Sequence, residues 1–225
     1  MLENSPIPAY QAKYVRQNGQ LFYQVPTGES YPGVTKIIQA TEPFEDKLPL
    51  LKWKQRVGQE TAQKISSQSS RRGTKLHQLI SKKLTGEEPE LIPDELRGFW
   101  NSVYPFLDDK IEQTLLVESL VWNSPNRYAG KLDCLARIDG EITLCDWKTA
   151  RRPRQNEWNR NYYLQCAAYA KAIEQVYTEF DIKVEQALVV VALPDEKAQI
   201  FCLEGQYLRE YWREFQSRLE LFYQV

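Results

Sequence analysis

The spacing of apolar positions changes along the chain. In the first part, aromatic and β-branched residues alternate around Asn18-Gly19, which predicts a hairpin followed by a short helix. From Lys47 to Thr85, apolar residues recur three and four positions apart, over 48–65 and again over 71–86, as in two amphipathic helices, and Gly86 marks the end of this segment. A third helix is predicted to begin near Pro93.

After residue 110 the apolar period shortens to that of strands. Strands are predicted at 114–122, 129–138 and 141–149, with Asp139-Gly140 as a tight turn between the last two. The remaining pattern predicts a helix at 161–177, a buried strand at 186–194, an edge strand at 198–204 and a closing helix at 207–222. This order favours a mixed central sheet flanked by helices.

The length of 225 residues suits one α/β domain. We expect residues 1–45 to form a hairpin cap, residues 46–110 a helical part and residues 111–225 the sheet core. Acidic residues (30) nearly balance basic residues (29), so binding of a polyanion would require local clustering of charge. We recognise neither a leader sequence nor an apolar membrane span, and we expect a cytoplasmic protein without membrane contact.

Two neighbouring strands of the predicted sheet carry acidic residues that are able to meet. Because alternate residues of a strand share a face, Leu144, Asp146 and Lys148 point the same way. With a turn at Asp139-Gly140, Asp133 on the preceding strand lies on that side too. Two carboxylates in a poorly solvated site repel each other, and a divalent ion with oxygen ligands removes the repulsion. Together with the lysine, such a site suits phosphodiester hydrolysis.

The spacing of Asp146 and Lys148 has little meaning alone. The same acid-x-Lys pattern occurs elsewhere, for example at Glu45-Lys47 and Asp108-Lys110, where solvated charge is the ordinary interpretation. Asp146 and Lys148 differ because they follow an apolar strand segment, in which an unpaired charge would cost several kcal/mol. A compensating charge or ion is therefore expected beside them.

Four short motifs occur in the order that is typical of one protein family. They are RGTKLH (Arg72 to His77), GKLD (Gly130 to Asp133), CDWKT (Cys145 to Thr149) and QCAAY (Gln165 to Tyr169), preceded by YPGVTKIIQAT (Tyr31 to Thr41). Through these motifs, residues 31–169 resemble the PD-(D/E)XK nuclease superfamily. The strongest likeness is to its RecB-like branch and, within it, to the mitochondrial genome maintenance exonuclease family and its phage and bacterial relatives.

The resemblance implies a restriction-endonuclease-like α/β fold: a mixed central sheet flanked by helices, with an N-terminal hairpin and helical segment. It also implies a site for Mg²⁺ or Mn²⁺. The implied ligands are His77, Asp133, Asp146 and the backbone carbonyl of Trp147, with Glu118 as a further ligand or a support. Lys148 would position the attacking water, while Gln165 and Tyr169, four residues apart on a helix, would line the site. The imidazole ligand would favour Mn²⁺.

Basic and aromatic residues gather on both sides of these motifs and are candidates for nucleic-acid contacts. They are Arg71, Arg72, Lys75, Arg151, Arg152, Arg154, Arg160, Trp158 and Tyr162. Phosphate contact is the natural use of clustered arginines, and aromatic faces beside them suit stacking of unpaired bases. The competing interpretations are solvated loop charge and, for Tyr162, core packing.

The combination favours a metal-dependent DNA exonuclease that acts on single-stranded DNA with a free end. By analogy, residues 44–65 could form an arch over the strand. An endonuclease specific for a structure or sequence on the same fold is the first alternative, since the motifs set the chemistry and not the substrate. A catalytically inactive nucleic-acid-binding module is the second, although the set of His77, Asp133, Asp146 and Lys148 is intact.

The cysteines give no sign of a metal cluster. Cys134, Cys145, Cys166 and Cys202 lack the close spacing of iron–sulfur ligands, so we expect no such centre. We expect all four to be small buried side chains.

Overall fold

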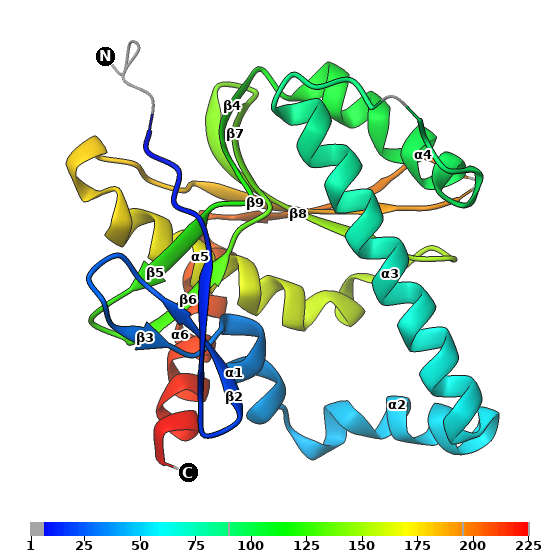
Figure 1. Cartoon of the computed structure of the whole chain (residues 1–225), viewed down its shortest axis with the longest axis horizontal. Coiled ribbons are helices and arrows are strands. Elements are labelled where there is room, and N and C mark those ends of the chain that lie inside the picture. The colour runs from blue at the N-terminus through cyan, green and yellow to red at the C-terminus, as the bar shows by residue number, and fades with distance from the viewer. Residues whose placement is uncertain (1–6, 90, 195, 225) are drawn as a thin grey trace.

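The computed structural model describes residues 7–89, 91–194 and 196–224, and its centre is a five-stranded sheet. The strands are β4 (Gln113–Val117), β7 (Cys134–Ile138), β8 (Glu141–Thr149), β9 (Gln186–Ala192) and β10 (Gln199–Glu204). Their order is β10-β9-β8-β7-β4, in which only β8 and β9 are parallel neighbours. The sheet is therefore mixed, as the sequence predicts, and helices flank it (Figure 1).

Six α-helices and several shorter elements surround the sheet in the described part of the chain. The helices are α1 (Val34–Ala40), α2 (Phe44–Val57), α3 (Gln59–Leu84), α4 (Asp94–Lys110), α5 (Arg160–Val176) and α6 (Gly205–Gln224), with 3₁₀ turns η1 (Asn156–Asn159) and η2 (Thr178–Phe180). The small sheets are formed by β1 (Lys13–Gln17), β2 (Gln20–Gln24) and β3 (Ser30–Tyr31), and by β5 (Leu120–Asn123) and β6 (Tyr128–Lys131). None of the described helices is long and apolar enough to cross a membrane.

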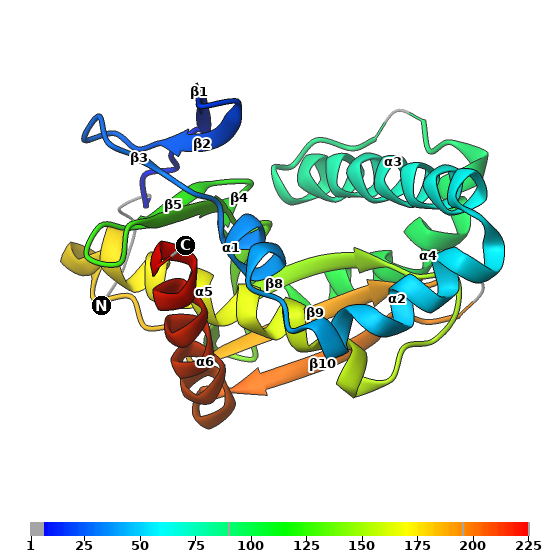
Figure 2. The same cartoon turned by 90° about the horizontal axis from the view of Figure 1, so that it is seen from below.

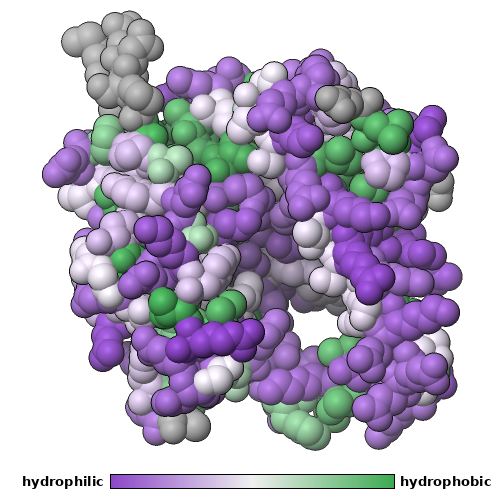
Figure 3. Space-filling view, viewed as in Figure 1, coloured by the Kyte–Doolittle hydropathy of each residue, from purple (hydrophilic) through white to green (hydrophobic). Residues whose placement is uncertain are grey.

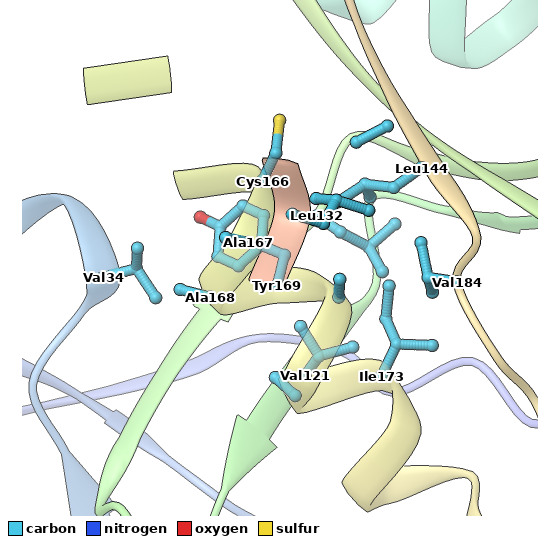
Figure 4. Packing of buried hydrophobic residues seen from close by; sticks show 14 of the residues in the cluster. Val34, Val121, Leu132, Leu144, Cys166, Ala167, Ala168, Tyr169, Ile173 and Val184 are labelled. Carbon is cyan, nitrogen blue, oxygen red and sulfur yellow. The ribbon is translucent and has the colours of Figure 1, made fainter. Parts of the chain in front are cut away.

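The alternation of side chains along β8 separates two hydrophobic cores. Leu144 is buried with residues of α5, such as Ala167 and Ile173, on one face of the sheet (Figure 4). Cys145 and Trp147 are buried on the other face, against α3 and α4. The predicted faces of this strand are confirmed, and Asp146 and Lys148 follow Leu144 to the α5 side.

Two of the predicted strands are each divided into two. Residues 114–122 form β4 and β5, and residues 129–138 form β6 and β7. The break falls at Glu118, whose φ of 51° interrupts the extended backbone. On the partner segment, Leu132 and Asp133 separate β6 from β7. Two hydrogen bonds join the segments at this point: Glu118 N–H donates to Asp133 O over 2.9 Å, and Leu132 N–H donates to Ser119 O over 2.9 Å. The two-stranded ribbon bends there from one sheet into another.

Helices lie where the sequence predicts them, but the first two divide at Gly58 and not between residues 65 and 71. Gly58, whose φ is 83°, separates α2 from α3 within the segment predicted from Lys47 to Thr85. No described side chain of α2 is buried, so this helix spans from α1 to α3 outside both cores (Figure 2). The N-terminal hairpin and its short following helix are β1, β2 and α1, as predicted.

Three of the four cysteines are buried, and the fourth is not. Cys134, Cys145 and Cys166 belong to the cores. Cys202 is exposed, so its predicted burial is wrong. The reason is the position of β10 at the edge of the sheet, where alternate residues face solvent while the neighbouring Leu203 is buried.

Candidate functional site

The bend between the two sheets brings two carboxylates beside an imidazole. Glu118 and Asp133 lie at the break in the ribbon, and His77 of α3 faces them. His77 Nδ1 is 3.4 Å from Asp133 Oδ1 and 3.9 Å from Glu118 Oε1. One ligand atom from each of these three residues lies within 4.8 Å of the others, which is the arrangement of a metal site.

The peptide groups of Trp147 connect β8 to this cluster. Trp147 N–H donates to Asp133 Oδ2 over 2.8 Å, and the Trp147 carbonyl accepts from His77 Nε2 over 2.7 Å. Since a carbonyl only accepts, Nε2 carries a proton, and Nδ1 faces Asp133 and Glu118. Burial opposes the charged form of the imidazole, but Asp133 raises the pKa of His77. The Trp147 side chain is buried in the opposite core.

Asp146 and Lys148 form a buried pair next to the cluster. Their side chains lie on the same face of β8, and Lys148 Nζ is 2.6 Å from Asp146 Oδ2. Asp146 is 2% exposed, and its Oδ2 receives no hydrogen bond of good geometry from any residue that the structure describes. A buried carboxylate oxygen with remaining acceptor capacity suits contact with a cation.

The electrostatics of the two aspartates differ. Burial raises the pKa of Asp146 to about 6, against the opposing effect of Lys148. Burial also opposes the charge of Asp133, but His77 outweighs it and lowers the pKa of this carboxyl group. Burial disfavours the ammonium form of Lys148, yet Asp146 and Asp133 together raise its pKa. The site therefore keeps Lys148 positive and Asp133 negative in close proximity.

The donor set fits a divalent cation. Two carboxylates, those of Glu118 and Asp133, and the His77 imidazole lie within reach of one ion, and oxygen with one imidazole nitrogen is a set that Mg²⁺ or Mn²⁺ accepts. Asp146 lies outside this group of three, on the neighbouring strand β8, where it pairs with Lys148. The free capacity of Asp146 Oδ2 supports the same conclusion. The residues thus make a candidate acidic metal site.

Gln165 and Tyr169 lie on α5 beneath the bend. Gln165 Nε2 donates to the Tyr169 hydroxyl over 3.4 Å. The Tyr169 ring packs against Gly130, where an added Cβ would lie 2.5 Å from Tyr169 Cε1. Tyr169 is buried, so the structure places it as a support of the GKLD segment, and Gln165 as the more accessible of the two.

One pocket of about 710 Å³ beside α3 collects four of the predicted nucleic-acid contacts, namely Arg71, Arg72, Lys75 and Arg151. Arg72 donates to Thr149 Oγ1 over 3.4 Å, which ties this pocket to the residue after Lys148. Lys75 is paired with Glu95 at 2.5 Å, and Arg71 and Arg151 are exposed. These predicted nucleic-acid contacts are brought together on one surface.

The other predicted contacts have internal partners or remain exposed. Arg154 donates to Asn159 Oδ1 over 2.8 Å and to Trp158 O over 2.7 Å, which fixes the loop after β8. Trp158 is 57% exposed, and Arg152 is exposed as well. The Tyr162 ring makes a cation–π contact with Lys148 beside the candidate metal site, with Nζ 4.7 Å from the ring centroid.

Arg160 contributes to the attachment of α2. It pairs with Asp46 of α2 at 3.4 Å and with Glu214 of α6 at 3.1 Å. Its neighbour Asn161 donates to Glu42 over 2.7 Å. Figure 3 shows an opening through the molecule, and comparison with Figure 1 places it among α2, α3 and the first turns of α5. The arch expected for residues 44–65 corresponds to α2 and the start of α3.

Lys131 is a residue of the site that sequence reasoning missed. It pairs with Glu118 and lines, with His77 and Asp133, a pocket of about 880 Å³. The signal was present in the GKLD motif, where Lys131 stands two residues before Asp133. The motif alone does not show the role of Lys131, because that role depends on the bend at Glu118, where the two side chains pair.

Comparisons with known proteins identify the family of the chain. The sequence profile of the PD-(D/E)XK nuclease superfamily matches residues 50–221. The chain is 28% identical over 200 residues to mitochondrial genome maintenance exonuclease 1 of Homo sapiens and 30% identical over 201 residues to that of Xenopus tropicalis. These matches cover 84% of this chain but 57% and 56% of the relatives, so the chain spans just over half their length. A putative exonuclease from Eubacterium rectale aligns with a TM-score of 0.47 and 12% identity, over 68% of this chain and 66% of that chain.

Proposed function

Because the chain belongs to the PD-(D/E)XK nuclease superfamily, we propose that it is a metal-dependent DNA exonuclease that acts on single strands with a free end. The observation that carries this proposal is the convergence of His77, Glu118 and Asp133 with the Asp146–Lys148 pair around the Trp147 peptide. The elements that supply these groups are distant in sequence, so the cluster depends on the whole fold.

The residues of the cluster divide the work of phosphodiester hydrolysis. A divalent cation held by Asp133, Asp146 and His77 would polarise a phosphate oxygen and lower the pKa of a water. Lys148, fixed by Asp146 at 2.6 Å, donates hydrogen bonds to that water or to the phosphate, where negative charge develops in the transition state. Glu118, which pairs with Lys131, would add a further carboxylate beside His77 and Asp133.

Arg71, Arg72 and Arg151 are the groups that suit the DNA backbone. They share one pocket with Lys75, and Arg72 reaches Thr149, next to Lys148. Phosphates bound along this surface would pass the candidate metal site. Such binding weakens as salt concentration rises.

The opening beneath α2 supports the preference for a free end. A strand inside a closed opening has to enter by its terminus, whereas a strand in an open groove binds anywhere along its length. The ion pair of Arg160 with Asp46 and the hydrogen bond from Asn161 to Glu42 hold the arch to α5. An exonuclease on single strands uses this geometry directly, and an endonuclease does not require it.

The test compares linear and closed circular single-stranded DNA of the same sequence, with Mg²⁺, Mn²⁺ or a chelator. We expect degradation of the linear strand that depends on the added metal, and no cleavage of the circle. Cleavage of the circle would establish the endonuclease alternative. Binding of both without cleavage under any metal condition would establish an inactive binding module.

A further inference from the structure

One face of the N-terminal hairpin carries exposed aromatic and cationic side chains. In the register of β1 and β2, Tyr14 pairs with Tyr23 and Arg16 pairs with Leu21, so these four side chains lie on one face. Tyr14 and Leu21 are each 49% exposed, and Arg16 is exposed as well. Exposed aromatic and aliphatic side chains with a cation beside them are typical of a binding surface.

The opposite face of the hairpin is occupied. Lys36 of α1 lies over the Phe22 ring at 4.4 Å from the centroid and donates to Gln20 Oε1 over 2.6 Å. The hairpin is thereby attached to α1 through one face. The other face, which carries Tyr14, Arg16, Leu21 and Tyr23 and is called the tyrosine face below, points away from these contacts.

The tyrosine face borders the candidate metal site. The Tyr23 ring packs on Gly33, where an added Cβ would lie 3.0 Å from Tyr23 Cε2, and against the hydrophobic cluster that contains Leu120 of β5 and Ala129 of β6. Gly33 is bridged to Ala129 of β6, two residues before Lys131. The hairpin therefore packs on the β5–β6 ribbon, which carries Lys131, the partner of Glu118.

The figures show the same relationship. In Figure 2 the hairpin and α3 project on the same side of the molecule, with β8 below and between them. Figure 3 shows the surface hollowed between these two parts, and the hollow leads toward the opening beneath α2. The hairpin and α3 thus lie on opposite sides of this hollow.

We propose that Tyr14, supported by Tyr23, stacks on an unpaired base of the substrate strand next to the cleavage site, with Arg16 near an adjoining phosphate. This inference rests on the proposed function, because it assigns the hairpin as a subsite for single-stranded DNA in the same groove.

The geometry of the tyrosine pair suits this use. The two rings have centroids 4.9 Å apart and an interplanar angle of 46°, so Tyr23 fixes the position of Tyr14 and leaves ring surface exposed. A rigid aromatic side chain binds a base with little loss of conformational freedom. Stacking accepts any base, which agrees with a nuclease that must process every sequence.

The test measures binding of a short fluorescein-labelled single-stranded DNA by anisotropy. The Lys148→Ala background slows cleavage during the measurement. Tyr14→Ala and Tyr14→Leu should weaken binding roughly 5- to 100-fold, because both remove the aromatic face. Tyr14→Trp should bind as well as the parent or better. Tyr207→Ala is the matched control, since Tyr207 is 57% exposed and lies on α6, and it should bind like the parent.

A second measurement locates the contact. Oligonucleotides with a single abasic site at successive positions are bound to the parent and to the Tyr14→Ala variant. The parent should lose affinity at one or two positions, and Tyr14→Ala should be insensitive at those positions. Unchanged binding by Tyr14→Ala and Tyr14→Leu would overturn the inference while leaving the nuclease proposal intact. Equal losses for Tyr14→Ala, Tyr14→Trp and Tyr207→Ala would also overturn it, because they would indicate a general structural defect.

The outcomes for the two proposals remain separate. If the wild-type protein neither binds nor cleaves single-stranded DNA, the proposed function fails, and the subsite fails with it. If cleavage is normal but concentration-dependent dimerisation disappears in Tyr14→Ala, the hairpin face binds a second copy instead of a base, and only the subsite is wrong.

Discussion

His77 Nε2 donates a hydrogen bond to the Trp147 carbonyl over 2.7 Å, between residues 70 positions apart in the chain. The bond orients the imidazole of α3 from the strand that carries Asp146 and Lys148. Removing it changes both the position and the basicity of the imidazole nitrogen that faces Asp133.

Substitution of His77 should therefore act through the metal. We expect His77→Ala to weaken Mn²⁺ affinity by at least about 10- to 100-fold, because an imidazole donor and its orienting bond are both lost. Isothermal titration of the protein with MnCl₂ measures this directly, without DNA. Gln78→Ala, an exposed neighbour on the same helix, is the control and should leave the affinity unchanged. Equal affinity in His77→Ala would remove His77 from the ligand set.

The Asp146–Lys148 pair makes a different prediction, which concerns stability as well as activity. Lys148→Met leaves the buried Asp146 carboxylate without its partner and should destabilise the protein by about 3 kcal/mol. The double variant with Asp146→Asn removes both charges and should recover most of that loss, while cleavage stays at least about 100-fold below wild type.

Chemical denaturation of the metal-free single and double variants measures the free energy of unfolding. A double variant whose loss equals the sum of the two single losses would show that the two side chains do not interact in the folded protein.

Gly130 is needed for a close approach and gives a third prediction. An added Cβ would lie 2.5 Å from Tyr169 Cε1, so Gly130→Ala should destabilise the protein by about 1 to 3 kcal/mol. Gly73→Ala is the matched control, because nothing lies within 4 Å of its Cβ position in α3. That substitution should stabilise the protein by about 0.5 to 1 kcal/mol. Thermal unfolding distinguishes these opposite signs, and a second substitution, Tyr169→Leu, should relieve the strain of Gly130→Ala.

The sequence predicts β8 well because its environment is regular. Strict alternation places Leu144, Asp146 and Lys148 on one face, and the Asp139-Gly140 turn fixes the register, with φ of 50° and 81°. The resemblance to a nuclease family added His77, which no strand or helix period could select. In the structure, His77 contacts the Trp147 carbonyl, and Lys148 contacts Asp146.

The break at Glu118 could not be predicted in the same way. The segments on both sides of it are apolar, so the strand period continues through Glu118 and through Leu132. The direction of the ribbon changes because of one residue with positive φ, and local propensity for Glu gives no sign of it. For the same reason, the pairing of Lys131 with Glu118 was not foreseen.

The arginines show a second limit. Clustering in the sequence groups Arg151 with Arg154, but Arg154 is bound to Asn159 and Trp158 while Arg151 is exposed in the basic pocket. Partner choice depends on tertiary contacts that composition does not contain.

This difference leads to a fourth prediction. Arg151→Ala should weaken single-stranded DNA binding and reduce the slope of log affinity against log salt by about 0.7, the value for one phosphate contact. Arg154→Ala should instead lower the melting temperature, because the loop after β8 loses two hydrogen bonds. Anisotropy at several salt concentrations and thermal unfolding are measured for both variants. A reduced salt slope in Arg154→Ala, together with a lowered melting temperature in Arg151→Ala, would contradict the assignment of Arg151 to DNA contact and of Arg154 to the loop.

The last prediction concerns α2. No described side chain of this helix is buried, so replacing its 14 residues should leave both cores intact. The helix spans about 21 Å at 1.5 Å per residue. A Gly/Ser segment of equal length has a root-mean-square end-to-end distance of about 20 Å, so it closes the same gap without holding a rigid opening. With streptavidin bound to biotin at both ends of a linear strand, the wild-type protein should be inactive because neither terminus can enter.

The Gly/Ser variant should degrade that blocked strand and should also cut circular single strands, since a flexible segment moves aside. Unmodified linear DNA serves as the control for both proteins. Resistance of the circle and of the blocked strand to the variant, combined with normal activity on the unmodified strand, would mean that α2 does not determine the requirement for a free end. In that case the requirement would reside in the groove between the hairpin and α3.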